Sequence, residues 1–294
     1  SILIPIYNYN ASPLILELHK QCTEAEIDFE ILCQDDCSSK YTQENLFAQT
    51  IGKVHYYLNN TNLGRGKNIN LLSQKAQFDY LLILDCDTYP KESSFIKKYI
   101  DSIALEKSKV VFGGIIYPDD KPNNEQLLRW IYGNKREAIP VEIRRKRGYK
   151  SALTSNFLIK KSVFNKYPFD ETITKYGYED LCFLTVLNSN KIAISHVANP
   201  TYHLNLETSK AYLSKTRLAI ENLIFLTDSH KITEQDSRLF STYNILRKLK
   251  LNALFGFAFK KTKNTLTHNL LSESPSLFLF DLYKLGHFIT LKKN

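Results

Sequence analysis

The chain has 294 residues, of which 43% are hydrophobic and 23% are charged, and its formal net charge is +9. This composition is typical of a globular protein that buries roughly 75% of its unfolded surface, and it excludes a wholly disordered chain. Ten Gly and nine Pro exclude a collagen-like or low-complexity architecture. The most apolar long segment, 276–291, is interrupted by Asp281, Lys284 and His287. We therefore expect no membrane-spanning helix.

Cysteine usage and the first residues predict the cellular compartment. The five cysteines are an odd number and contain no Cys-x-x-Cys pair. This argues against a disulfide framework and a structural zinc site, and for a reducing environment. The chain opens on apolar residues without a charged segment before them, which predicts no signal peptide. We expect a cytoplasmic protein, either free or at the inner face of the membrane.

Over the first two hundred residues, short apolar runs alternate with amphipathic stretches. The runs predict strands at 2–6, 29–33, 54–58, 80–84 and 110–116, and the stretches predict helices at 13–25, 67–77 and 93–105. Residues 81–84 are apolar without alternation, as in central parallel strands that are covered on both faces. This order predicts the α/β class, with an open, mostly parallel sheet flanked by helices.

The strand signal ends after about residue 207. Three helical patterns follow, at 210–227, 241–259 and 277–288. We therefore expect one domain over residues 1–207 and a helical C-terminal extension over residues 208–294.

The most informative feature is the pair Asp85 and Asp87, which directly follows the apolar run 80–84. The side-chain period of the strand puts Asp85 and Asp87 on the same side. Two like charges there repel unless they are neutralised, and a divalent cation with oxygen ligands neutralises them. Ligands bind at the carboxyl edge of an α/β sheet. Helix capping by Asp87 is the structural alternative, and the pair favours a cation site over it.

Asp35 and Asp36 follow the run 29–33 in the same way. A carboxylate at that position can accept hydrogen bonds from a nucleobase or a ribose. The residues Asp-Asp-Cys-Ser-Ser are equally suited to a turn, so both interpretations stay open for this segment alone.

Glu179 and Asp180 begin a predicted helix after a loop of aromatic and Gly residues. The helix dipole favours acids in a first turn, so this segment in isolation has a sufficient structural explanation.

Together these segments resemble the family 2 glycosyltransferases with the GT-A, Rossmann-like fold. Residues 2–8 look like the family's opening strand with its Pro-x-Tyr-Asn end, and residues 34–38 look like its Asp-Asp-x-Ser motif. Residues 62–70 look like its Asn-x-Gly-Lys-x-Arg segment, with Lys67 where Arg is usual.

Two further motifs complete the resemblance, which covers about residues 1–207. Asp85-Cys86-Asp87 matches the D-x-D metal motif, and Glu179-Asp180 matches the E-D motif on the acceptor side. Residues 167–171 read Tyr-Pro-Phe-Asp-Glu where the family has Gly-Gly-Phe-Asp-Glu, which changes the expected shape of the acceptor loop.

The resemblance implies an inverting transfer of a sugar from a nucleotide diphosphate sugar, with UDP as the expected nucleotide. The acceptor would be a hydroxyl of a glycan or of a lipid-linked saccharide, in surface polysaccharide synthesis. The resemblance implies Mn²⁺ or Mg²⁺ on Asp87, with Asp85 on the metal or on the donor ribose. It also offers His203 as a third metal ligand, and an ordinary hydrogen-bonded histidine is the equal alternative there.

The remaining site residues also come from the resemblance. Pro5 and Tyr7 would belong to the donor site, where Tyr7 stacks on the base and Asp35 or Asp36 hydrogen-bonds it. Lys67, aided by Arg65, would lie near the base or the diphosphate. For the acceptor, Asp180 would be the general base and Glu179 would bind a hydroxyl. His196, inside the apolar run 192–197, is interpreted as a core or supporting histidine.

Basic residues concentrate in two places. Residues 144–147 are Arg-Arg-Lys-Arg in a segment with few helix or strand signals, which predicts either a mobile loop over the diphosphate or a solvated charge run. Between Asp236 and Glu273 there are seven Lys and Arg and no acid, mixed with Phe and Leu. This composition suits a peripheral contact with an anionic membrane, and packing against the catalytic domain or homodimer contacts are the equal alternatives.

Two other functions fit parts of the pattern. A sugar-phosphate nucleotidyltransferase usually has a Gly-rich loop after its first strand, whereas residues 7–12 contain no Gly. A non-catalytic basic binding protein would explain the charge. A nucleic-acid-binding module would interleave basic and aromatic residues on one face, which the first two-thirds of the chain lacks. We expect no nucleic acid partner.

Overall fold

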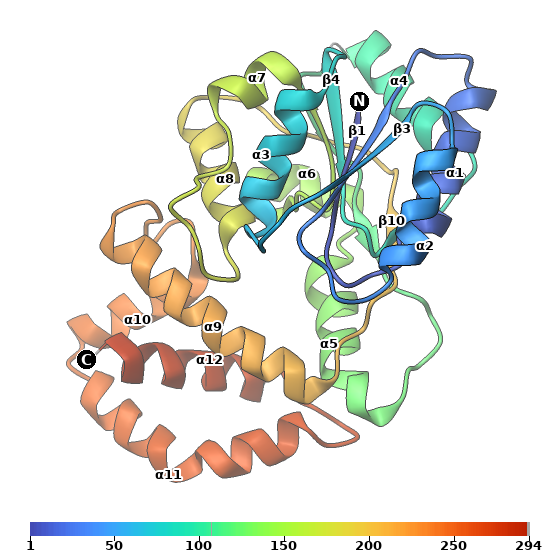
Figure 1. The fold of residues 1–294 in the computed structure, drawn as a ribbon. Helices are drawn as coiled ribbons and strands as arrows, with labels where there is room; N and C mark the ends of the chain where they lie inside the picture. The colour runs from blue at the N-terminus through green and yellow to red at the C-terminus, as the bar shows by residue number, and fades with distance from the viewer. Residues whose placement is uncertain (107, 293–294) are drawn as a thin grey trace. The chain divides into compact units, whose positions relative to one another are not determined.

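The structure is a computed structural model that describes residues 1–106 and 108–292. The chain forms two compact units, which are described separately (Figure 1). The first unit comprises Ser1–Pro118, Glu137–Thr174 and Val186–Asn205. The second comprises Asp119–Arg136, Lys175–Thr185 and Leu206–Asn294. It thus contains the segment predicted as a C-terminal extension, together with two shorter segments from earlier in the chain.

A seven-stranded sheet forms the centre of the first unit, in the order β3-β2-β1-β4-β8-β6-β9. Its strands are β1 (Ile2–Ile6), β2 (Ile31–Asp35), β3 (Val54–Leu58), β4 (Tyr80–Leu84), β6 (Val110–Phe112), β8 (Asn156–Lys160) and β9 (Ser195–His196). The first four strands pair in parallel, and β8 is antiparallel to both β4 and β6. The α/β class with a mostly parallel sheet is confirmed.

A second sheet of three short strands lies in the same unit, in the order β5-β10-β7. Its strands are β5 (Thr88–Pro90), β7 (Ile115–Ile116) and β10 (Thr201–His203). The single strand predicted at 110–116 is wrong, because Gly113 and Gly114 divide it into β6 and β7. Gly114 has a φ of +105°, and a Cβ on Gly113 would come within 2.4 Å of the Tyr99 hydroxyl oxygen.

Helices cover the large sheet and complete the core of the first unit. They are α1 (Ser12–Glu24), α2 (Thr42–Leu46), α3 (Arg65–Lys75), α4 (Phe95–Glu106), α6 (Val141–Arg147) and α7 (Lys161–Lys166). Leu14 and Leu18 of α1 and Phe95 of α4 pack with Ile4 and Ile6 of β1 in one apolar cluster. The apolar faces of α1 and α4 therefore help to bury the central strands β1 and β4.

Arg144 corrects the interpretation of the basic run 144–147. The run ends α6, so it is not a loop, and Arg145, Lys146 and Arg147 are exposed as in a solvated charge run. Arg144 differs from them, because it is only 3% exposed. Its guanidinium donates to the carbonyl oxygens of Phe112, Gly113 and Val197 at 2.8–3.1 Å, and its Nε donates to that of Ile139. Burial lowers the pKa of Arg144 to about 10, so it stays charged at neutral pH. The side chain joins the ends of β6 and β9.

The second unit is helical. Its helices are α5 (Leu127–Tyr132), the start of α8 (Glu179–Ser189), α9 (Ser209–Asp228), α10 (Arg238–Lys248), α11 (Asn252–Leu270) and α12 (Leu277–Lys292). Leu128, Leu213, Phe259 and Phe280 share its apolar core. Among the residues described, no helix combines the length and hydropathy needed to cross a membrane.

One long helix was predicted at 241–259, and this prediction is wrong. The segment forms two helices, α10 and α11, which are separated by Leu249–Leu251. Lys250 has a φ of +58°, a left-handed conformation that cannot continue an α-helix. A left-handed Lys has no sequence signature comparable to Gly, so the break was not visible in the apolar pattern.

Candidate functional site

The strand order of the large sheet reverses between β1 and β4. Open α/β sheets bind ligands at the carboxyl ends of the strands at such a switch point. β4 pairs with β1 only through Ile2 and Leu3, so the ladder stops before Pro5, which has no N–H to donate. Tyr7 follows the end of β1, and Asp85 follows the end of β4. The topology therefore brings the Pro-x-Tyr-Asn segment and the Asp85-Cys86-Asp87 segment to one edge of the sheet.

Asp85 and Asp87 lie in a turn after β4. The backbone N–H and the hydroxyl of Thr88 both donate to the Asp85 carbonyl oxygen, at 3.1 and 2.8 Å. The expectation that strand alternation aligns the two carboxylates is therefore wrong, because the strand ends at Leu84. The turn gives each carboxylate its own partner: Asp85 faces Arg65, and Asp87 faces His203.

Asp87 and His203 form the part of the site best suited to a cation. Asp87 Oδ2 and His203 Nε2 are 3.6 Å apart, and the two side chains are 18% and 15% exposed. β5 and β10 hold this pair, since His203 lies opposite Thr88 and the Leu204 N–H donates to the Asp87 carbonyl oxygen. The Tyr117 ring stacks on the imidazole with centroids 5.4 Å apart. The orientation of His203 is therefore fixed from two sides.

The donor set of this pair fits a cation that is shared with a substrate. Adjacent ligands of an octahedral Mg²⁺ lie about 3 Å apart, close to the separation of these two atoms. Across residues 1–106 and 108–292, no three or more His, Cys, Asp and Glu side chains gather into a metal-holding group. Mg²⁺ usually binds through one or two carboxylates together with substrate phosphates, and two protein ligands are compatible with that arrangement.

Asp85 forms an ion pair with Arg65. Arg65 Nε and Nη2 both approach Asp85 Oδ1, at 2.8 and 2.7 Å, and Nη1 donates to the Thr154 hydroxyl at 2.8 Å. The Arg65 guanidinium also lies over the Phe169 ring, 5.9 Å from its centroid. Each partner is 27% exposed, so the pair is accessible to a ligand. Because Arg65 already balances its charge, Asp85 is less suited to a cation than Asp87.

Asp35 and Asp36 are buried and anchor the loops around the strand ends. Asp35 accepts from the Ser38 N–H at 2.7 Å and from the Tyr56 hydroxyl at 2.6 Å. Burial, together with the hydrogen bond to Asp35, raises the pKa of Tyr56. Asp36 accepts from the N–H groups of Leu63 and Gly64, at 2.8 and 2.9 Å. Gly64 directly precedes α3, so Asp36 fixes the helix end that carries Arg65.

Tyr7 is the exposed aromatic side chain at this edge, with 54% of its surface accessible. The loop that carries it is held by Asn8, whose side-chain oxygen accepts from the N–H groups of Ser39 and Lys40, at 2.8 and 3.2 Å. Tyr7 therefore presents a ring to solvent from a fixed backbone. Such a ring can stack on a flat ligand.

Lys67 lies on the first turn of α3 and faces Glu171, with 4.0 Å between Nζ and the carboxylate. Both side chains are nearly half exposed, so this pair contributes little to stability. Its weakness leaves Lys67 able to exchange Glu171 for another anion.

Glu179 and Asp180 begin α8 in the second unit. The loop before them is anchored by Asn222 of α9, whose side-chain amide donates to the Gly177 carbonyl oxygen. Gly177 has a φ of +95°, and a Cβ there would lie 2.5 Å from Ala219. The Gly predicted as part of a loop is therefore required by its conformation and by close packing.

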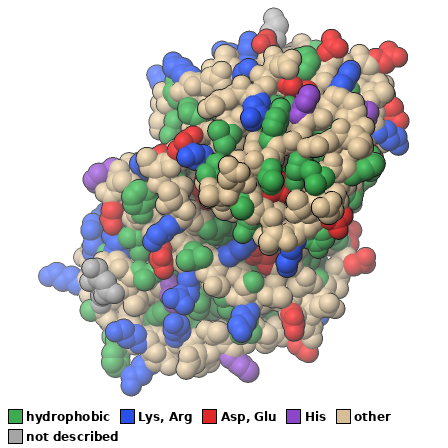
Figure 2. Space-filling view, in the orientation of Figure 1, with side chains coloured by type: hydrophobic (Ala, Val, Ile, Leu, Met, Phe, Trp, Pro, Cys, Tyr) green, Lys and Arg blue, Asp and Glu red, His purple; other side chains and the backbone are tan. Residues whose placement is uncertain are grey.

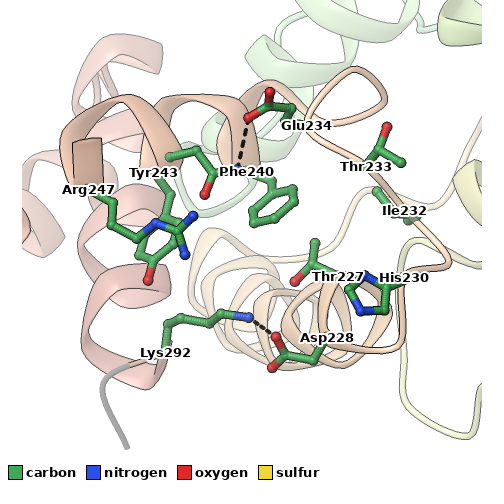
Figure 3. Close-up of a pocket in the computed structure, with 11 residues that line it drawn as sticks. Thr227, Asp228, His230, Ile232, Thr233, Glu234, Phe240, Tyr243, Arg247 and Lys292 are labelled. Atoms are coloured by element: carbon green, nitrogen blue, oxygen red, sulfur yellow. Dashed lines mark hydrogen bonds and ion pairs between the residues drawn. The ribbon is translucent and has the colours of Figure 1, made fainter. Parts of the chain in front are cut away.

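The second unit also contains a cavity of about 540 Å³ beside α9, α10 and the end of α12 (Figure 3). Lys292 reaches Asp228 across it, and Glu234 accepts from Asn244. A cavity of about 580 Å³ in the first unit is lined by Gln34, Tyr56 and other residues near the ends of β2 and β3. Neither lining contains a residue that the sequence predicted for the site.

Sequence reasoning missed several residues that fix this edge. Asn59 directly follows β3 and donates to Asp36 at 2.8 Å, so the rule that polar residues follow central strands would have identified it. Thr154 and Tyr117 carry no such signal, because their roles depend on contacts with Arg65 and His203, which are far away in the sequence.

The chain matches the model of glycosyl transferase family 2 over residues 1–168. This match covers more than half of the chain, so the protein belongs to this family and is a glycosyltransferase. The resemblance identified from five short motifs is confirmed. Of the functions that the sequence allowed, family membership selects glycosyl transfer over nucleotidyl transfer and over non-catalytic binding.

Solved structures show the same GT-A fold at low sequence identity. S. aureus TarS 1–349 in complex with UDP is 17% identical with a TM-score of 0.51, over 100% of this chain and 90% of that chain. The mannosyltransferase PcManGT from Pyrobaculum calidifontis, in complex with GDP-Man and Mn²⁺, is 13% identical with a TM-score of 0.53, over 79% and 64%. Mannosyl-3-phosphoglycerate synthase from Rubrobacter xylanophilus is 16% identical with a TM-score of 0.54, over 79% and 75%. No curated protein matches the chain.

Proposed function

We propose that the protein transfers a sugar, with inversion, from a nucleotide diphosphate sugar to a hydroxyl of a glycan or lipid-linked saccharide, in the synthesis of a surface polysaccharide. The observation that carries this proposal is the Asp87–His203 pair, 3.6 Å apart, at the end of the strand beside the switch point. Mn²⁺ or Mg²⁺ bound by Asp87 and His203 would stabilise the negative charge that develops on the departing diphosphate.

The donor nucleotide would bind along the ends of β1 and β2. Tyr7 is exposed there and suited to stack on the base. Asp35 and Asp36 are buried and accept hydrogen bonds from neighbouring N–H groups, so they would act there by keeping the loops around the base and the ribose in place. Because S. aureus TarS binds UDP, a UDP-sugar is the first donor to test.

Asp85, Arg65 and Lys67 would surround the rest of the donor. Arg65 holds Asp85 in one orientation, which suits Asp85 to accept a hydrogen bond from the donor ribose. Lys67 would leave its weak contact with Glu171 and approach the diphosphate. Its positive charge, added to that of the cation, would favour departure of the nucleoside diphosphate.

The acceptor hydroxyl needs a base that removes its proton during attack. We assign this role to Asp180 and the binding of an acceptor hydroxyl to Glu179. Inversion follows when the base and the leaving group act on opposite faces of the sugar. The proton would pass from the acceptor oxygen to the Asp180 carboxylate as the new glycosidic bond forms.

The test uses the full chain with a panel of nucleotide sugars and Mn²⁺, and measures the release of nucleoside diphosphate. We expect slow hydrolysis of one donor without acceptor and a higher rate when the acceptor is present. Asp180→Asn should bind the donor normally and lose at least 100-fold in transfer, consistent with the contribution of a general base. Transfer at the wild-type rate by Asp180→Asn would show that another residue is the base. Formation of pyrophosphate from a sugar phosphate and a nucleoside triphosphate would contradict the proposed reaction itself.

A further inference from the structure

The positive charge of the protein is concentrated on two helices of the second unit. Residues 237–272 contain seven Lys and Arg and no Asp or Glu, so this segment carries +7 of the net charge of +9. Arg247, Lys248, Lys250, Lys260 and Lys261 are exposed. Within the described residues none of these five forms an ion pair, whereas Lys215 and Lys292 in the same unit do.

Large apolar side chains are exposed on the same two helices. They are Ile245 (54% exposed), Leu249 (61%), Leu251 (40%), Leu254 (65%) and Phe257 (62%). Five large exposed apolar side chains within thirteen residues are more than the scattered single residues that are normal on a surface. We call these five residues and the five cations the α10–α11 surface.

The geometry of α11 places both kinds of side chain on one face. Leu254, Phe257, Ala258 and Lys261 are spaced i, i+3, i+4 and i+7 and are all exposed. The opposite face, with Phe259 and the other buried positions of α11, packs into the core of the unit. Lys261 also lies over the Phe257 ring, 5.7 Å from its centroid. The apolar stripe therefore has cations within and beside it, and it is not used for packing inside the unit.

Figure 2 shows the same mixture as a surface. On its lower left, where Figure 1 draws α10 and the start of α11, Lys and Arg side chains gather with hydrophobic side chains among them.

We propose that the α10–α11 surface binds the surface of an anionic phospholipid bilayer, with Leu254 and Phe257 inserted below the headgroups. Cations near such a surface are attracted to lipid phosphates, and exposed Leu and Phe side chains gain from leaving water. This inference does not depend on the transfer reaction proposed above.

Charge distinguishes a bilayer from a second copy of the chain. In a symmetric dimer the same surface would face itself, so at least ten cations without acidic partners would be brought together. A nucleic acid would satisfy the cations and leave the apolar stripe in water. A bilayer with anionic headgroups satisfies both components of the surface.

The test measures co-sedimentation of the full chain with vesicles. Vesicles of phosphatidylcholine with about one-third phosphatidylglycerol should bind the protein at least tenfold more tightly than vesicles of phosphatidylcholine alone. Added salt should weaken the binding, because each Lys or Arg close to an anionic surface contributes roughly fivefold to affinity and is screened by salt.

Two variants and one matched control identify the surface. Leu254→Ser/Phe257→Ser should lose at least tenfold in vesicle affinity, and Lys260→Gln/Lys261→Gln should lose a similar factor without altering any apolar residue. Leu105→Ser removes an apolar side chain that is 82% exposed in the first unit and should bind vesicles like the wild type. Circular dichroism at each step checks that the variants are folded.

Three outcomes would overturn the proposal. The first is vesicle binding by Leu254→Ser/Phe257→Ser that equals the wild type. The second is equal binding to neutral and anionic vesicles. The third is a dimer in sedimentation velocity that Leu254→Ser/Phe257→Ser dissociates, in the absence of vesicle binding. Donor hydrolysis, measured in parallel, should be unchanged in all variants, so failure of this proposal is distinguishable from failure of the proposed reaction.

Discussion

The two units use charged side chains in opposite ways. At the sheet edge of the first unit each carboxylate has a fixed partner: Asp36 binds two backbone N–H groups, and Asp85 binds Arg65. On α10 and α11 of the second unit, cations such as Lys248 and Lys260 are exposed and form no ion pair within the described part of the chain. Chemistry needs atoms held to within a fraction of an ångström, whereas a fluid partner needs accessible charge. Charged side chains with fixed partners therefore suit the first unit to catalysis, whereas exposed cations without ion pairs among the residues described suit α10 and α11 to binding a membrane surface.

The strongest challenge to this contrast is the removal of one fixed carboxylate. Asp87→Asn should reduce sugar transfer about 10³-fold, equivalent to about 4 kcal/mol, because the pair with His203 loses its charge. Isothermal titration should also show weaker binding of the nucleotide sugar in Mn²⁺. Asp101→Asn, an exposed acid on α4, is the matched control and should behave like the wild type. Full activity of Asp87→Asn would contradict the assigned site.

The next largest effect concerns the buried cation of the first unit. Arg144→Met should lower the free energy of unfolding by about 3–5 kcal/mol, because buried carbonyl oxygens such as those of Phe112 and Gly113 lose their donors. Urea denaturation measures the change. Lys146→Met, in the same helix and exposed, should change the stability by less than about 0.5 kcal/mol. Similar losses of stability for both variants would show that the hydrogen bonds of Arg144 to the ends of β6 and β9 do not stabilise the unit.

Acid should lower the stability of both units, so the two units do not differ in this respect. Burial lowers the pKa of His196 in the first unit and of His287 in the second to about 4. The unfolded histidines titrate near 6.5 and bind more protons below that pH, so stability falls as the pH decreases from 6.5 toward 4.

The expected loss is about 2–3 kcal/mol per histidine at pH 4.5 relative to pH 7. Thermal unfolding at a series of pH values measures it. His196→Gln should reduce the acid sensitivity, and the exposed His230→Gln should leave it unchanged. A melting temperature that is constant from pH 7 to 4.5 would contradict the assignment.

The smallest expected effect concerns a helix end of the second unit. The Thr208 hydroxyl accepts from the Ala211 N–H at 3.2 Å and caps α9. Thr208→Ala should therefore cost about 1 kcal/mol of stability in urea denaturation. Thr265→Ala, at an exposed position inside α11, should be neutral or slightly stabilising because Ala has the higher helix propensity.

Much of the fold could be predicted because it depends on local apolar patterns. Residues 2–6, 54–58 and 80–84 form strands with the predicted bounds, since buried central strands are continuous apolar runs. The separation of β6 from β7 was missed although Gly113-Gly114 is a local turn signal, whereas the close approach of Gly113 to Tyr99 and Asn199 has no signal in the sequence.

The composition of the site was predictable, but its pairings were not. Acids after strands indicated the edge, since the end of a strand is a local property. The partner of each acid comes from a distant segment: Arg65 for Asp85, and His203 for Asp87. Arg144 was misinterpreted for the same reason, because a sequence does not show which backbone carbonyls surround a cation.

The hydrogen bonds made by the buried Arg144 have a consequence for the stability of the protein in acid. Within the described part of the chain, the Arg144 guanidinium donates its hydrogen bonds to main-chain oxygens, which do not ionise, so no protonation event between pH 7 and 4 removes a partner from it. Burial is the main reason that the pKa of the neighbouring His196 is lowered, and the positive charge of Arg144 lowers it further. The hydrogen bonds of Arg144 therefore persist in acid, and its charge adds to the effect of burial on the adjacent imidazole.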